Sequence, residues 1–207
     1  MVAAVVLFAV LEVFLHRLKG QERTLLAAAP AAATSTGCGG VATTKPYPRG
    51  LDRFHIGQAP LRTMPPLSTY PSAPPASGPH APTPLDAGVY SQPPPIGEAI
   101  HSLEHAAVIV WYDPSAASSP ELDRLRRFFA QGSEMNHVIV APYDYSGQGT
   151  AGKLPAGRQM ALVAWHRVRY CDRPSLAVAF DFVHRFRYDL YQRGAYQGEA
   201  PEKYAPI

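Results

Sequence analysis

Three histidines and a glutamate lie close together in the middle of the chain, and their types suit metal binding. His101, Glu104 and His105 form the motif His-Ser-Leu-Glu-His, and His80 ends the earlier motif Ser-Gly-Pro-His. Residues four apart share one face of a helix, so His101 and His105 can point their imidazoles at one centre. Glu104 lies on nearly the same face. This spacing predicts a chelating group.

A binding site for a transition metal usually needs three or four ligands, so other residues must complete this group. His80 and His55 are the natural candidates, because proline-rich backbone beside them is stiff and can hold ligands at little entropic cost. Neutral imidazole suits zinc or copper. We therefore predict a site for zinc or copper, with no organic cofactor, formed by His55, His80, His101, Glu104 and His105. The alternative is that these histidines bond to the backbone and serve only the fold.

The motif His101–His105 also matches the His-x-x-Glu-His signature of inverted zinc peptidases. Those enzymes carry the motif inside a long helix. Here Pro93–Pro95 precede it and a β-branched run follows it, which leaves room for only a short helix. The context argues against a protease. Glu104 beside two histidines could still act as a general acid and base, so a small His/Glu hydrolase remains an alternative.

The composition is that of one folded domain with an unusual proline content. A chain of 207 residues can bury a sizeable core without help. Its net charge of +3 is small and its lysines and arginines are scattered, so the sequence predicts no nucleic-acid binding. Twelve of its 22 prolines lie between Pro60 and Pro95, which excludes regular helix or central strand there.

The N-terminus resembles part of a membrane anchor. Met1–Leu15 is apolar except for Glu12, and Arg17, Lys19 and Arg23 follow it. A helix of fifteen residues covers about 22 Å, less than the roughly 30 Å of a bilayer core. By the positive-inside rule, basic residues on this side would keep the rest of the chain in the cytoplasm. The alternatives are an anchor with a basic leader further upstream and a buried helix.

We predict three regions along the chain. Residues 1–26 form the anchor-like segment, which would place the protein in a membrane. Residues 27–37, which are mostly alanine and other small residues, form a linker. Residues 38–207 form a single folded domain.

The folded domain is predicted to combine strands and helices. Strands are expected at Ala106–Tyr112, 136–143 and 158–170, and helices at Pro120–Gln131 and Ser175–Gln192. The order is strand, helix, strand, strand, helix. It predicts an α+β fold in which two helices pack on a small, largely antiparallel sheet. A long proline-rich irregular segment and an N-terminal apolar helix precede this unit.

The two cysteines bear on both chemistry and location. The element order also occurs in the second half of thioredoxin-like folds, but Cys38 and Cys171 are 133 positions apart and form no Cys-x-x-Cys pair. Dithiol exchange is therefore not expected. In an exported domain the pair could form one structural disulfide. The alternative is two unrelated buried thiols.

Several motifs together resemble DUF3105, a bacterial family of uncharacterised proteins. They are Tyr70–His80, Gly88–Tyr90, His101–Tyr112, Leu162–Arg167 and Gly198–Glu202, and the resemblance covers roughly Cys38 to Glu202. His55 falls where members have a histidine, whereas Ala106 departs from the glycine of the family pattern. Many members carry one N-terminal membrane helix and an exposed domain. The resemblance thus implies a cell-membrane protein whose domain faces outside the cytoplasm, and it implies no activity.

Three functions follow from these observations. The first is a membrane-anchored, extracytoplasmic domain that binds zinc or copper through the histidine cluster. The second is a non-catalytic structural or interaction module with internally satisfied histidines, and the third is the small hydrolase. The first, which involves no catalysis, is the function that we predict. None of the three identifies a protein partner.

Overall fold

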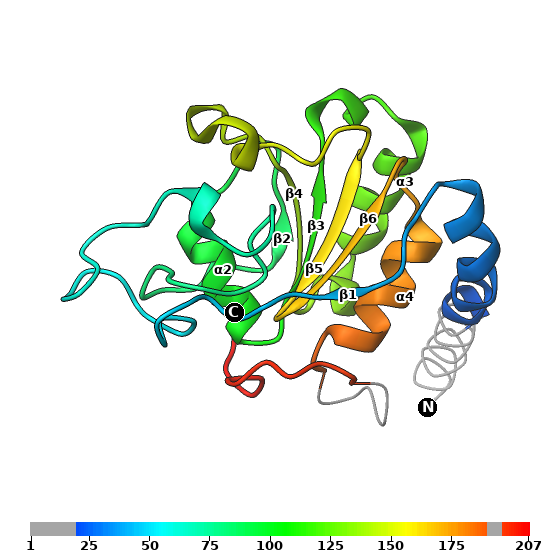
Figure 1. Cartoon of the computed structure of the whole chain (residues 1–207). Helices are drawn as coiled ribbons and strands as arrows, with labels where there is room; N and C mark the ends of the chain where they lie inside the picture. The colour runs from blue at the N-terminus through cyan, green and yellow to red at the C-terminus, as the bar shows by residue number, and fades with distance from the viewer. Residues whose placement is uncertain (1–19, 190–195) are drawn as a thin grey trace, which may run out of the picture.

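The structure is a computed structural model. In the residues that it describes, helices and loops pack around a six-stranded sheet (Figure 1). These residues are 20–189 and 196–207, so the predicted anchor Met1–Leu15 lies outside them. The strand order is β1-β6-β5-β3-β4-β2. The strands are β1 Ala42–Thr43, β2 Gly88–Val89, β3 Val108–Tyr112, β4 Val138–Pro142, β5 Met160–Ala164 and β6 Arg167–Cys171.

The sheet is mixed, and the predicted α+β class is confirmed. Strands β1, β6, β5 and β3 pair antiparallel, whereas β3 with β4 and β4 with β2 are parallel. Three of the α-helices are α2 Ile96–Glu104, α3 Pro120–Phe129 and α4 Leu176–Phe186. Short 3-10 helices lie at Leu67–Thr69, Pro114–Ala116, Gly132–Met135 and Ser146–Gly152. Helix α3 makes the crossover that a parallel β3-β4 pair requires.

The stretch 158–170, predicted as one strand, is a hairpin of β5 and β6. Trp165 and His166 turn the chain, and His166 has a positive φ of 56°. Glycine or asparagine usually marks such a turn. Because neither residue type stands here, the apolar pattern runs across the turn and hides it from sequence analysis.

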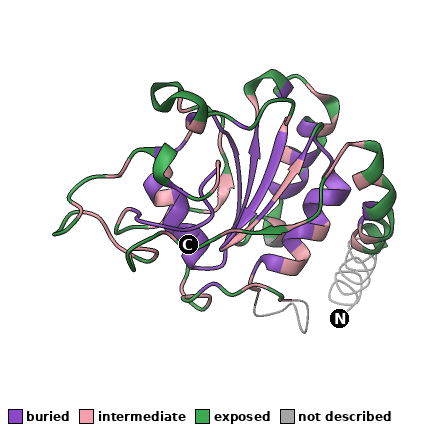
Figure 2. Ribbon diagram, in the orientation of Figure 1, coloured by how far each residue is buried: buried purple, intermediate pink, exposed green. Residues whose placement is uncertain are grey.

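The central strands are buried on both faces, which accounts for their continuous apolar runs (Figure 2). Val108, Val110 and Tyr112 belong to the core formed with α3 and α4. Ile109 and Trp111, which alternate with them, belong to a second core that includes residues of α2. As predicted, α3 and α4 pack on the same sheet. They cover one face, while α2 and much of the proline-rich segment cover the other (Figure 1).

Helix α4 is shorter than predicted. It begins after the N-cap Ser175, whose side chain accepts a hydrogen bond from the Val178 amide, and it ends at Phe186. The predicted end, Gln192, lies outside the described residues. Arg187 is extended, and the next amide, that of Tyr188, donates to Ala106 O at 3.2 Å. This bond draws the chain toward the end of α2 and away from the helix axis.

The alanine-rich segment predicted as a linker is largely helical. Residues 20–35 form a helix, and Leu25 and Ala29 are buried in the core with α4. Alanine has the highest helix propensity, so a run of low complexity can also form a helix when it has a surface to pack on. Within residues 20–189 and 196–207, no helix is both long enough and apolar enough to cross a membrane.

Cys38 and Cys171 form a disulfide, the first of the two alternatives predicted for them. Cys171 is fully buried at the end of β6, and Cys38 follows the helix of residues 20–35. The bond therefore fastens the N-terminal helix to the sheet across 133 positions of sequence.

We expect the double variant Cys38→Ala/Cys171→Ala to lower the free energy of unfolding by about 2–5 kcal/mol, because a long loop is no longer closed in the unfolded chain. Urea unfolding of the oxidised wild type and of the variant measures this difference. An unchanged urea midpoint would show that the bond contributes nothing to stability.

Candidate metal centre

Helix α2 places His101 and Glu104 on the sheet face opposite α3 and α4, and His105 follows as its C-cap. Ala99 and Leu103 pack into the core of that face and are fully buried. The helix begins after Pro95 and has only nine residues, as expected from the flanking sequence. It is much shorter than the helix that carries this motif in inverted zinc peptidases.

The chain leaves α2 through a Schellman motif centred on Ala106. The amide of Ala106 donates to Leu103 O and that of Ala107 to Ser102 O, each at 3.0 Å. Ala106 has a φ of 65°, a left-handed conformation that costs alanine about 1–2 kcal/mol. Its methyl group is buried, and this burial stabilises the fold by about 0.8 kcal/mol relative to glycine. Burial of the methyl group therefore offsets part of the strain of alanine at this position, where the resemblance implies a glycine.

Three backbone carbonyls fix the orientation of three imidazoles. The Nδ1 atoms of His80, His101 and His105 lie 2.7, 2.7 and 2.8 Å from the carbonyl oxygens of Gly78, Ala81 and Pro206, respectively. A carbonyl oxygen can only accept, so each Nδ1 must donate its proton. In the neutral ring, Nε2 then carries a lone pair, which is the form that binds a metal ion.

Glu104 faces these rings from inside the protein, with a side chain that is only 1% exposed. Its Oε1 accepts a charged hydrogen bond from Arg53 Nε, and its Oε2 lies 3.0 Å from His80 Nε2 and 3.8 Å from His55 Nε2. Burial alone would raise the pKa of Glu104, but contacts with His80 and Arg53 outweigh burial and lower it. Glu104 is therefore a buried carboxylate anion.

Three atoms at this point have no hydrogen-bond partner among the described residues. They are His55 Nε2, His80 Nε2 and Glu104 Oε2, and all three are buried. The contact of His80 with Glu104 is short, but it lacks the geometry of a hydrogen bond. Unsatisfied buried polar atoms are rare and costly, at about 1–3 kcal/mol each.

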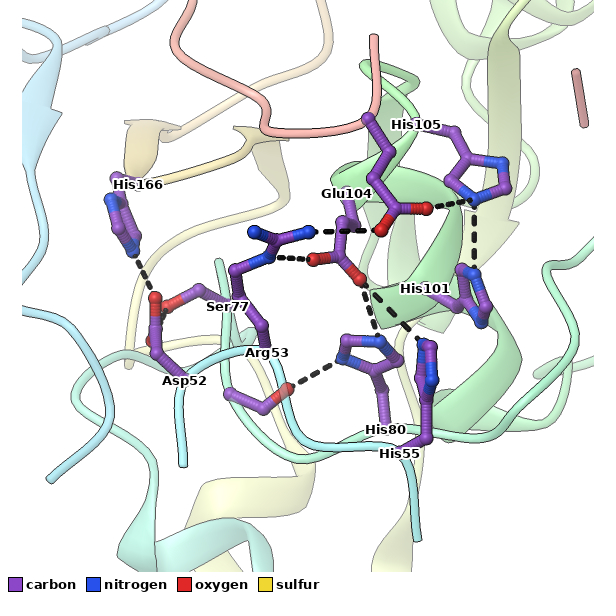
Figure 3. Close-up of polar contacts among 11 residues, drawn as sticks. Asp52, Arg53, His55, Ser77, His80, His101, Glu104, His105 and His166 are labelled. Carbon is purple, nitrogen blue, oxygen red and sulfur yellow. Dashed lines mark hydrogen bonds and ion pairs between the residues drawn. The ribbon is translucent and has the colours of Figure 1, made fainter. Parts of the chain in front are cut away.

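Ligand atoms from His55, His80, His101 and Glu104 lie within 4.8 Å of one another, and their side chains point together in Figure 3. A second group of ligand atoms, from His101, His105 and Glu202, meets the same limit. The structure thus brings together all five predicted residues, in two overlapping groups that share His101.

His101 and His105 approach each other directly, with 3.0 Å between their Nε2 atoms. Burial lowers the pKa of His101 to about 4, although the bond to Ala81 opposes this shift. His101 is therefore neutral at pH 7 and presents a lone pair to His105. The contact needs a proton or a cation between the two nitrogens.

His55 reaches the site from the loop before the proline-rich segment, where its backbone pairs with that of His80 in an isolated parallel bridge. Its ring stacks on that of His101, with 4.7 Å between the ring centroids. Burial and the neighbouring His80 lower the pKa of His55, which favours its neutral form.

Sequence analysis missed Arg53 and Glu202. Arg53 donates to Glu104 and, at 2.9 Å, to Glu202 Oε1, while Glu202 Oε2 lies 3.4 Å from His105 Nε2 (Figure 3). The Glu202 amide also donates to Glu104 O. Glu202 ends the motif Gly198–Glu202 and Arg53 lies two residues before His55, but nothing in the spacing of either residue relates it to α2.

Comparison with protein families gives one match. A family model described as "Protein of unknown function (DUF3105)" matches residues 64–199, about two thirds of the chain. The chain belongs to the DUF3105 family. Comparison with curated proteins and with solved structures gave no match.

The DUF3105 match includes His80, His101, Glu104 and His105. His55, Arg53 and Glu202 lie outside it, although the structure places all three against the matched residues. The complete cluster therefore depends on segments on both sides of the matched region.

A second polar network secures the loop that carries Arg53 and His55. Asp52 accepts hydrogen bonds from Ser77 Oγ at 2.6 Å and from the Tyr47 amide at 2.5 Å, and it pairs with His166 Nε2 at 2.7 Å. Ser77 thus bonds to the carboxylate and not to the imidazole, so the order differs from that of a Ser-His-Asp triad. The network around Asp52 joins the loop that carries Asp52 to the segments that carry Ser77 and His166.

We expect Asp52→Asn to lower the free energy of unfolding at pH 7 by about 1–3 kcal/mol, because an anion that accepts several hydrogen bonds is lost. Burial would raise the pKa of Asp52, but the bonds from His166, Ser77 and Tyr47 outweigh it and lower the pKa. The stabilisation is therefore complete above the unfolded-state pKa of about 4 and is lost as the pH falls through the folded-state pKa.

Thermal unfolding of the wild type and Asp52→Asn between pH 7 and pH 3 should accordingly show a difference that shrinks in acid. Asp86→Asn, at an exposed position, is the matched control and should have little effect. A difference that grows on acidification would contradict this account.

Proposed function

We propose that this DUF3105 domain binds one transition-metal ion, zinc or copper, at the histidine cluster. The observation that carries the proposal is a set of close contacts between atoms that present lone pairs when the rings are neutral. His80 Nε2 lies 3.0 Å from the Glu104 carboxylate, and His101 Nε2 lies 3.0 Å from His105 Nε2. Because each of these rings donates Nδ1–H to a carbonyl, each contact needs a positive charge, which is either a proton on Nε2 or a metal ion.

The size of the cluster suits one ion. Imidazole and carboxylate ligands bind zinc at about 2.0–2.2 Å, so two ligands of one ion lie at most about 4.3 Å apart. The ligand atoms of His55, His80, His101 and Glu104 are within 4.8 Å of one another, so small side-chain shifts suffice. A divalent cation there would also satisfy the three unpartnered buried atoms.

The donor set supports zinc or copper over harder ions. Three imidazoles and one carboxylate are the ligands that these two metals share, whereas calcium and magnesium prefer an all-oxygen site. The carbonyl partners of the Nδ1 atoms are the outer contacts that usually fix metal-binding histidines.

The two alternative functions are less well supported. A module with internally satisfied histidines should not leave His55 Nε2, His80 Nε2 and Glu104 Oε2 buried without hydrogen bonds. A hydrolase would use Glu104 as its general base. The pKa of Glu104 is lowered by His80 and Arg53, despite burial, and this makes it a weak base.

We further propose that the domain lies outside the cytoplasm, anchored in the cell membrane by the N-terminal segment. The disulfide between Cys38 and Cys171 supports this location, because such bonds persist in oxidising compartments. The apolar run Met1–Leu15 supports an anchor.

Untagged wild-type protein should retain about one equivalent of zinc or copper, measured by elemental analysis after purification and dialysis. His80→Ala and His101→Ala should each lower retention at least about tenfold, because each removes a ligand. His184→Ala, on α4, is the matched control and should keep the metal. Wild-type protein with no metal, or unchanged metal in both cluster variants, would show that the cluster is purely structural.

A reporter enzyme fused after Ile207 tests the location. We expect activity from a reporter that works only outside the cytoplasm, and none from one that works only inside. Deletion of Met1–Leu15 should abolish the external signal, because the anchor would be lost. A reporter active only in the cytoplasm would overturn this part of the proposal.

A further inference from the structure

The cluster contains two places for an ion, and they differ in depth. The first, the inner position, is formed by His55, His80, His101 and Glu104. The second, the outer position, is formed by His101, His105 and Glu202. Among the described residues, His105 and Glu202 do not join the inner group within the same 4.8 Å limit. One ion therefore cannot be bound by both sets without rearrangement.

His101 belongs to both positions, but it can serve only one of them at a time. Its Nδ1 donates to Ala81 O at 2.7 Å, which leaves Nε2 as its single ligand atom. An imidazole nitrogen has one lone pair in the ring plane, so it binds one ion. The two positions are thus alternatives around a common ligand.

Arg53 connects the carboxylates of the two positions. It contacts Oε1 of Glu104 with Nε and Oε1 of Glu202 with Nη2. In each glutamate the other oxygen, Oε2, is turned toward histidine: His80 for Glu104 and His105 for Glu202 (Figure 3). Arg53 therefore orients one carboxylate at each position and leaves one oxygen of each for a metal ion.

Exposure distinguishes the two positions. The Glu202 side chain is 39% exposed, whereas those of His80 and Glu104 are 0% and 1% exposed. His55 is also 39% exposed, but its Nε2 atom is buried. An ion arriving from solvent meets Glu202 before it meets the buried carboxylate.

We propose that an incoming metal ion first binds His105, Glu202 and His101 at the outer position and then moves inward by ligand exchange on His101. The inference rests on the proposed metal-binding function. In the transfer, His105 and Glu202 release the ion as His55, His80 and Glu104 bind it, while His101 turns from one set to the other. The charge of the ion does not change.

Stopped-flow mixing of metal-free, full-length protein with Zn²⁺ and a chromophoric zinc chelator tests this route. The variants are Glu202→Gln and His105→Ala, and the matched control is Glu199→Gln, which removes a carboxylate three residues from Glu202. Glu199 pairs with Arg167 and takes no part in the cluster. Circular dichroism checks that each variant is folded, and Glu202→Gln keeps the size of the side chain.

We expect both outer variants to bind one equivalent of zinc at equilibrium, but with an uptake rate at least about tenfold lower, because the capturing ligands are lost. Glu199→Gln should match the wild type. His80→Ala should behave in the opposite way, taking up zinc rapidly but losing it to the chelator at equilibrium.

Four other results would overturn the inference or its basis. Unchanged uptake in both outer variants would exclude the outer position as the route and leave the proposed function intact. Loss of stoichiometric zinc in both outer variants would mean that the ligands of the inner and outer positions bind one ion together. Two tightly bound ions per wild-type chain would contradict the sharing of His101. A wild type that binds no zinc or copper would overturn the proposed function itself.

Discussion

The hydrogen bonds from three histidine Nδ1 atoms to backbone carbonyls are the interactions on which the site depends. They set the tautomer of each neutral ring and turn Nε2 toward the cluster. The acceptors, Gly78, Ala81 and Pro206, belong to irregular chain, where carbonyls are not used by a helix or a sheet ladder. Regular structure could not supply carbonyls at these points, because its own hydrogen bonds occupy them.

The fold holds that irregular chain in place from several sides. The Ala81 amide donates to Gly97 O, and His80 donates its amide to Phe54 O, so the proline-rich segment is bonded both to α2 and to the loop that carries His55. A methyl group on Gly97 would lie 3.1 Å from the Ala81 nitrogen, which shows how closely α2 and this segment approach. The site thus lies where a helix packed on the sheet meets a segment that has little core of its own.

Local patterns predicted the parts of this site but not its assembly. The spacing of His101 and His105 predicted that their rings share one face. Apolar β-branched runs predicted β3 and β4, and helix signals predicted α3 and the start of α4. The turn between β5 and β6 has no glycine to mark it, and the end of α4 depends on a bond between Tyr188 and Ala106. Arg53 and Glu202 could not be predicted, because the contact between them spans 149 positions and arises only from tertiary structure.

The buried carboxylate explains why the cluster takes this form. Glu104 is almost fully enclosed, and a buried anion is stable only if cations or donors surround it. Arg53 pairs with one oxygen of Glu104. The Arg53 side chain is 54% exposed, so water partly screens its charge. The second oxygen faces His80 Nε2 and His55 Nε2, and none of these three atoms has a hydrogen-bond partner among the described residues. A bound cation would supply the missing charge at that oxygen, and it would join α2, the His55 loop and the proline-rich segment through one centre. Metal binding and the cohesion of this face of the sheet would then be the same interaction.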